Sequence, residues 1–92
     1  MKLKDGINIA KLNDLLQRFR AAVRRRMDRS LADEIERQII QSGRVFLDIG
    51  TTKKLARWCN TNGSPYQDGM PIAQEISQLL FGRVLDRYVL NT

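Results

Sequence analysis

The sequence predicts a small all-α domain with four helices, over about residues 7–27, 31–42, 52–60 and 71–90. Apolar residues recur at steps of three and four along these segments, which is the period of an amphipathic helix. Glycines and turn dipeptides separate most of the segments. The length of 92 residues fits a single domain, residues 1–92, and a content of 42% hydrophobic and 28% charged residues is typical of a folded chain.

The first predicted helix, residues 7–27, carries its apolar residues on one stripe. Asn8 is placed to cap the start of this helix. Leu15 and Ala22 widen the stripe, which consists of Ile9, Leu12, Leu16, Phe19, Val23 and Met27. At 100° per residue these positions share one face, and we expect that face to pack on the rest of the domain.

The second predicted helix covers about residues 31–42. Ser30 and Asp33 form a short variant of the capping box, SLAD, and Asp33 is also spaced to pair with Arg37. Gly43 is placed to end the helix. The link to the first helix is about three residues long, so we expect the two helices to pack as an antiparallel hairpin. The apolar line of the second helix is Leu31, Ile35, Ile39 and Ile40.

Residues 44–49 are either a short strand or a buried connection, because periodicity cannot decide a run this short. Thr51 or Thr52 can then cap the third helix, residues 52–60. We expect its apolar side chains to point inward and its basic side chains to face water. The inward set is Leu55, Trp58 and Cys59, and the outward set is Lys53, Lys54 and Arg57.

Pro71 suits the first position of the last predicted helix, residues 71–90, whose apolar residues change face at Gly82 by roughly 130–150°. A second chain could cover one face, the helix could break at Gly82, or the helix could lie at the centre of a monomer. We favour the first arrangement, a homodimer. The interface predicted for it consists of Phe81, Leu85, Tyr88 and Val89.

The net charge of +6 lies in the first third of the chain. Residues 1–29 contain nine basic and three acidic residues, whereas residues 30–92 contain seven of each. Such asymmetry indicates contact with nucleic acid or another acidic surface.

Six arginines fall within the fourteen residues of QRFRAAVRRRMDRS, at positions 17–30. Arginines on one helix can hold a row of phosphate oxygens with forked donors, although a solvated helix face also needs charge. Lys11, Arg18 and Arg25 lie seven apart and Arg29 four further on, nearly on one line. The predicted nucleic-acid-binding residues are Lys11, Arg18, Arg20, Arg24, Arg25, Arg29, Lys53, Lys54 and Arg57.

The third and fourth helices raise the possibility of a helix-turn-helix, with Gln74, Ser77 and Gln78 as groups that could read bases. The connection of about ten residues is longer than the three or four of that motif, and an ordinary helical pair explains the pattern as well. Trp58 and Tyr66 could stack on bases, but a single tryptophan in a small domain more often belongs to the core.

These observations favour a non-enzymatic protein that binds nucleic acid, DNA rather than RNA. The alternative is an adaptor or inhibitor that docks its basic helix on an acidic protein surface. The chain has no histidine and one cysteine, Cys59, so the commonest catalytic base is missing and Cys59 fits a small buried side chain. We expect no catalytic residue, cofactor or metal. We also expect no membrane span and no signal peptide, hence a cytoplasmic protein.

Overall fold

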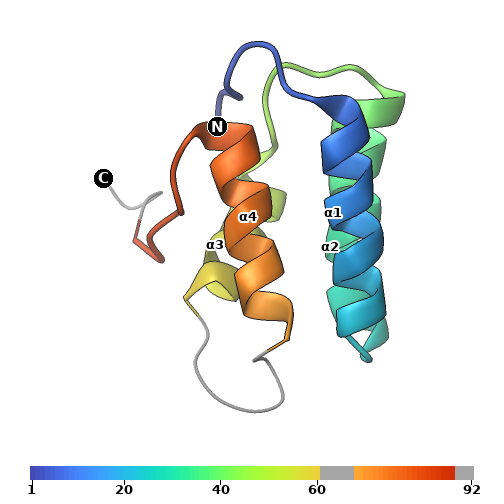
Figure 1. Cartoon of the computed structure of the whole chain (residues 1–92). Coiled ribbons are helices and arrows are strands. Elements are labelled where there is room, and N and C mark those ends of the chain that lie inside the picture. Colours follow the sequence, from blue (N-terminus) through green and yellow to red (C-terminus); the bar gives the residue numbers. More distant parts are fainter. Residues whose placement is uncertain (61–67, 89–92) are drawn as a thin grey trace.

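A computed structural model describes residues 1–60 and 68–88 and confirms the all-α prediction (Figure 1). The helices are α1 (Ile9–Ala22), α2 (Arg26–Ile35), the π-helix η1 (Glu36–Gln41), α3 (Ile49–Cys59) and α4 (Gly69–Phe81). Within the described ranges no strand forms, and residues 44–49 are a connection that makes one isolated antiparallel bridge, between Lys2 and Phe46.

Helices α1 and α2 form the predicted antiparallel hairpin with a link of three residues, 23–25 (Figure 1). The link lies five residues earlier than the sequence predicted, so the first helix ends at Ala22 instead of 27. Val23 is extended at this point and its side chain is buried. The guanidinium of Arg29 donates a hydrogen bond to the Val23 carbonyl at 3.2 Å, which satisfies one of the groups that the end of α1 leaves free.

The predicted start of the second helix at Ser30 is wrong. The helical run begins at Arg26, and the Ser30 hydroxyl donates to the Met27 carbonyl within it. Met27 consequently leaves the apolar stripe of the first helix and is 83% exposed. The run continues through η1 and ends where Gly43 adopts a φ of 62°, as its position predicted.

Asp48, rather than Thr51 or Thr52, caps α3. Its carboxylate accepts from the Thr51 backbone N–H at 2.7 Å and from the buried Gln38 side chain at 2.8 Å. The side-chain carbonyl of Gln38 in turn accepts a hydrogen bond from the Asp48 backbone N–H. The backbone hydrogen bond from Thr51, followed by those from the Thr51 and Gln38 side chains, lowers the pKa of Asp48. This network fixes η1 against the start of α3.

The last helix ends at Phe81, not at residue 90, because Gly82 takes the left-handed conformation that ends many helices. The chain then turns back, and Leu85 is 1% exposed in the core of the same molecule. The Ser77 hydroxyl holds this return: it donates to the Arg83 carbonyl and accepts from the Leu85 N–H.

The core lies between the α1–α2 hairpin and the α3–α4 pair, which stand side by side in Figure 1. Phe19 and Trp58 meet edge to face within it, with ring centroids 5.1 Å apart. The hydrophobic stripes that the sequence indicated supply most of its other members, among them Leu12, Leu16, Ile35, Leu55, Ile76 and Leu80.

Candidate nucleic-acid interface

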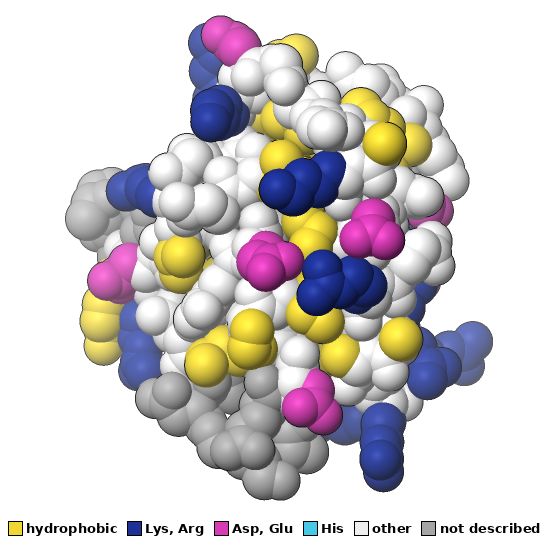
Figure 2. Space-filling view, viewed as in Figure 1, with side chains coloured by type: hydrophobic (Ala, Val, Ile, Leu, Met, Phe, Trp, Pro, Cys, Tyr) yellow, Lys and Arg dark blue, Asp and Glu magenta, His cyan; other side chains and the backbone are white. Residues whose placement is uncertain are grey.

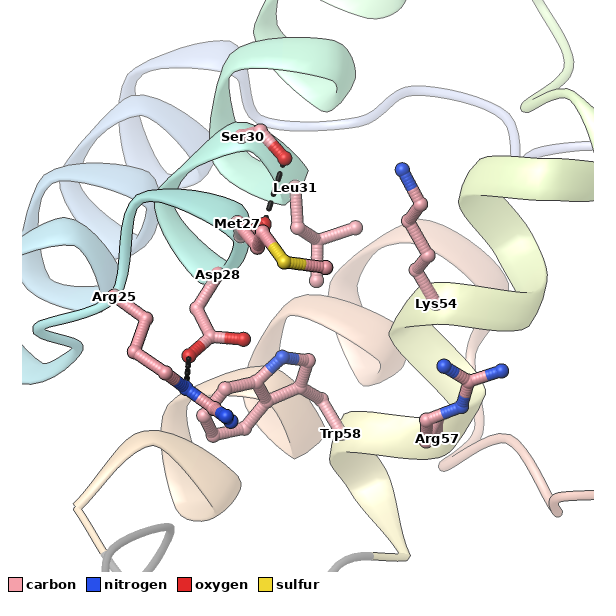
Figure 3. A pocket seen from close by; sticks show the side chains of 8 residues that line it. All are labelled: Arg25, Met27, Asp28, Ser30, Leu31, Lys54, Arg57 and Trp58. Atoms are coloured by element: carbon pink, nitrogen blue, oxygen red, sulfur yellow. Dashed lines mark hydrogen bonds and ion pairs between the residues drawn. The ribbon is translucent and has the colours of Figure 1, made fainter.

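A cleft of about 480 Å³ opens between the start of α2 and α3 (Figure 3). Its lining comes from two segments that are far apart in the sequence. The α1–α2 link and the first turns of α2 contribute Arg25, Met27, Asp28, Ser30 and Leu31, and α3 contributes Lys54, Arg57 and Trp58. The hairpin geometry therefore brings the basic first third of the chain next to the basic face of α3.

Three of the eight residues that line this cleft are apolar. Figure 3 shows Met27 and Leu31 from α2 and Trp58 from α3 turned toward the same hollow. Trp58 belongs mainly to the core, since it is 8% exposed, and it presents only an edge to the cleft. The interpretation of Trp58 as a core residue is confirmed, while its exposed edge still contributes to the site.

Positive charge surrounds the opening. Arg25 lies beside the indole ring, and Lys54 and Arg57 follow α3 along the other side (Figure 3). Arg24 and Arg26 flank Arg25 in the chain and are exposed. We give the name basic rim to the three basic residues that line the cleft and to their exposed basic neighbours in the chain: Arg24, Arg25, Arg26, Lys53, Lys54 and Arg57.

Some rim residues also have acidic neighbours. Arg25 Nε lies 3.0 Å from Asp28 Oδ2, and Lys54 Nζ lies 3.2 Å from Glu34 Oε1. Within residues 1–60 and 68–88, Arg24, Arg26 and Lys53 form no ion pair. Some cations of the rim are therefore paired with carboxylates, and others remain open to a ligand.

Two of the predicted phosphate-binding arginines on α1 instead connect helices. Arg20 is half-buried and pairs with Asp33 at 2.8 Å and with Glu36 at 3.6 Å. Arg18 lies 3.6 Å from Glu75 of α4. Asp33 thus pairs with Arg20 rather than with Arg37. Figure 2 shows the result on the face formed by α1 and α4, where basic and acidic side chains alternate over apolar ones.

The continuous line of basic residues from Lys11 to Arg29 does not form. Lys11 and Arg18 are on α1, whereas Arg25 is the residue that precedes α2 and Arg29 bonds back to Val23. The arginines at 24, 25 and 26 gather instead at the turn between α1 and α2, and basic side chains project at that edge of the molecule in Figure 2. Lys11 is exposed and separate from the rim.

A smaller hollow of about 390 Å³ continues the basic surface on the far side of α3. Lys53 and Arg57 line it together with Asn60 and Arg87, which the return of the chain after Gly82 brings to this place. Sequence reasoning missed Arg87, Arg26 and the exposed Met27. The run of three consecutive arginines at 24–26 was a signal for Arg26. The positions of Met27 and Arg87, by contrast, depend on where α1 and α4 end.

The side chains that could read bases in a helix-turn-helix are partly committed to the interior. Ser77 holds the Leu85 segment, and Gln74 donates to the Cys59 carbonyl at 3.0 Å. Gln78 is exposed. Helix α4 therefore does not present this set of residues as one reading surface. Tyr66 lies outside the described residues.

The residues predicted to form a dimer interface differ in their exposure to solvent. Leu85 is buried in its own chain, Phe81 is half-buried and Tyr88 is exposed. Val89 lies outside the described residues. Since α4 ends at Phe81, Leu85 and Tyr88 do not continue its apolar stripe, and the prediction that Leu85 is exposed on such a stripe is wrong.

Cys59 is buried, and burial raises its pKa to about 11. Its sulfur lies 3.5 Å from the Ala73 carbonyl oxygen. A thiol with this pKa is protonated near neutral pH, which makes it a poor nucleophile. Over the two described ranges no three His, Cys, Asp or Glu side chains gather as metal ligands.

Comparison with protein-family models, curated proteins and solved structures finds no significant match to this chain. The helices of the described part are each too short or too polar to cross a membrane.

Proposed function

We propose that this protein binds nucleic acid through the basic rim, with phosphate groups held by side chains from the α1–α2 link and from α3. The observation that carries the proposal is the convergence of the two segments on one cleft, which Arg25, Lys54 and Arg57 line together. The proposal places the ligand at the end of the hairpin and not along α1, because Arg24, Arg26 and Lys53 form no ion pair within the described residues. Arg18 and Arg20, by contrast, pair with carboxylates of other helices.

Phosphate binding suits this surface for two reasons. Guanidinium groups match phosphate oxygens with paired donors, and the rim presents four arginines beside two lysines. The charge of the chain also favours a polyanion over a neutral ligand, since the net charge is +6. Binding then consists of positioning and electrostatic attraction, with no catalytic step.

The proposal is tested by comparing two triple variants that lose the same charge. One removes open cations of the rim (Arg24→Gln, Arg26→Gln, Lys53→Gln), and the other removes exposed cations elsewhere (Lys2→Gln, Lys4→Gln, Arg44→Gln). Fluorescence anisotropy with labelled duplex DNA, single-stranded DNA and RNA at ~50 and ~200 mM salt gives the affinity and its salt dependence.

We expect the rim variant to bind at least about tenfold more weakly. Its salt slope should fall by about one unit for each phosphate that the missing side chains no longer neutralise. The matched variant should keep most of the affinity. Equal losses of affinity in the two variants would show that overall charge, not the rim, attracts the ligand. A wild-type chain that binds no nucleic acid at low salt would overturn the proposal in favour of an acidic protein partner.

Self-association of the chain stays a prediction, which light scattering can check, and binding through the rim does not require it.

A further inference from the structure

We infer that the cleft receives one unstacked base of a single-stranded nucleic acid, while the phosphates on either side of that base lie on the basic rim. The inference rests on the proposed function and adds the form of the ligand and the position of one of its bases.

The cleft has the size of a site for a flat group, and its lining combines apolar with charged side chains. Its volume of about 480 Å³ falls in the range of small-ligand sites, roughly 300–1,000 Å³. Met27 and Leu31 form one wall and the edge of Trp58 forms the floor (Figure 3). Bases that leave the stack are commonly held by aromatic and apolar side chains of this kind.

The charged lining of the cleft consists of three cations, Arg25, Lys54 and Arg57, and one carboxylate, Asp28. The carboxylate of Asp28 faces the cleft and its side chain is 15% exposed. This carboxylate already pairs with Arg25 at 3.0 Å, and a base that enters can donate its N–H groups to carboxylate oxygen. Arg24, Arg26 and Lys53 are exposed and adjoin lining residues in the chain, where the phosphates of neighbouring nucleotides would meet them.

A base in the cleft favours single strands over duplex. The bases of a duplex are paired and stacked, so one of them would have to leave the helix before it could enter. A single strand offers bases that are already free or weakly stacked. The rim can still attract the phosphates of a duplex, but without the contribution from the cleft.

Met27 provides a way to test the cleft without disturbing the fold. Its side chain is 83% exposed and extends over the opening (Figure 3), so the core does not depend on it. Ile49 is a matched control, because it is another exposed large apolar residue, 63% exposed, and does not line this cleft.

Trp58 is the only tryptophan of the chain, so its fluorescence reports on the floor of the cleft. The experiment titrates the full-length protein with a single strand of about 12 nucleotides, within the length that such sites cover, and with the duplex of the same sequence. The Met27→Ala and Ile49→Ala variants are titrated in parallel, with circular dichroism to confirm that each is folded.

We expect saturable quenching of Trp58 by the single strand and an affinity at least about fivefold higher than for the duplex. Met27→Ala should weaken binding of the single strand about threefold or more and bring it closer to the duplex value, whereas Ile49→Ala should bind as the wild type does.

Equal or tighter binding of the duplex, or a Met27→Ala variant with unchanged affinity for the single strand, would overturn the base site. Either result would leave binding through the rim intact. The absence of any nucleic-acid binding would instead overturn the proposed function, and with it this inference.

Discussion

At the scale of single residues, hydrogen bonding and burial determine what each polar side chain can do. Asp48 shows this, because one carboxylate begins α3 and also satisfies the buried Gln38. Cys59 shows the opposite case, in which burial makes the charged form unfavourable and raises the pKa of the thiol to about 11.

The raised pKa of Cys59 predicts a loss of stability at alkaline pH. The folded protein holds the thiol proton up to about pH 11, while the unfolded chain releases it near its ordinary pKa of 9.0. The contribution of the protonated thiol to the free energy of unfolding is therefore complete below pH 9 and is lost as the pH rises toward 11. Relative to Cys59→Ala, the free energy of unfolding of the wild type should fall by about 1.4 kcal/mol per pH unit in this window.

Urea unfolding of both proteins between pH 7 and 10.5 measures this difference. A gap between the two proteins that stays constant over the whole range would mean that the thiol reaches water in the folded state. Rapid labelling of the native thiol at neutral pH would lead to the same conclusion.

At the scale of elements, the ends of the helices determine how they fit together. Helix α4 begins at Gly69, where an added Cβ atom would come within 2.6 Å of the Trp58 ring and 3.2 Å of Val23. Glycine at this position lets α4 approach the contact between α3 and the end of α1. A side chain would push these three elements apart at the centre of the core.

Gly69→Ala should therefore lower the free energy of unfolding by about 1–3 kcal/mol, the usual cost of overpacking. Gly50→Ala is the control, since a Cβ atom there would meet only Asp48 Oδ1, at 3.7 Å. It should leave stability unchanged or raise it by up to about 1 kcal/mol. Thermal unfolding followed by circular dichroism compares them, and equal stability of the two variants would contradict the close approach of α4.

At the scale of the whole molecule, the return of the chain after Gly82 closes the core and completes the basic surface. Leu85 fills the interior, and Arg87 reaches the side of α3 that carries Lys53 and Arg57. One local event, the left-handed conformation of Gly82, thus changes both the place of Leu85 and the expected site.

Leu85→Asp should destabilise the single chain by more than about 3 kcal/mol, because it places an unpaired carboxylate where the side chain is 1% exposed. Tyr88→Asp is the control, since Tyr88 is 60% exposed and should tolerate the charge. Thermal unfolding at two protein concentrations, with light scattering, distinguishes burial of Leu85 within its own chain from burial between two chains. A Leu85→Asp protein that stays folded and only becomes smaller would restore Leu85 to an interface between chains.

Local sequence patterns were enough to establish the helical class, the hairpin, most of the apolar stripes, the caps at Asn8 and Gly43 and the burial of Cys59. Ile9 and Met27 are the exceptions in the first stripe, since both are exposed. These features follow from periodicity and from the preferences of neighbouring residues, which act over one or two turns of helix. The charge asymmetry, a property of composition, was equally plain. It located the arginines of the α1–α2 link but neither the cations of α3 nor the way the two segments meet.

The folded chain was needed to establish where α1 and α4 end, which arginines remain open to a ligand and that Leu85 belongs to the core. Val23 leaves the helix where it can be buried, and Arg20 is held by two carboxylates thirteen or more residues away in the chain. Leu85 is fixed by Ser77 and Asn60 from two other segments. Each outcome depends on contacts between distant residues, whose free energies outweigh the local preferences that a sequence pattern expresses.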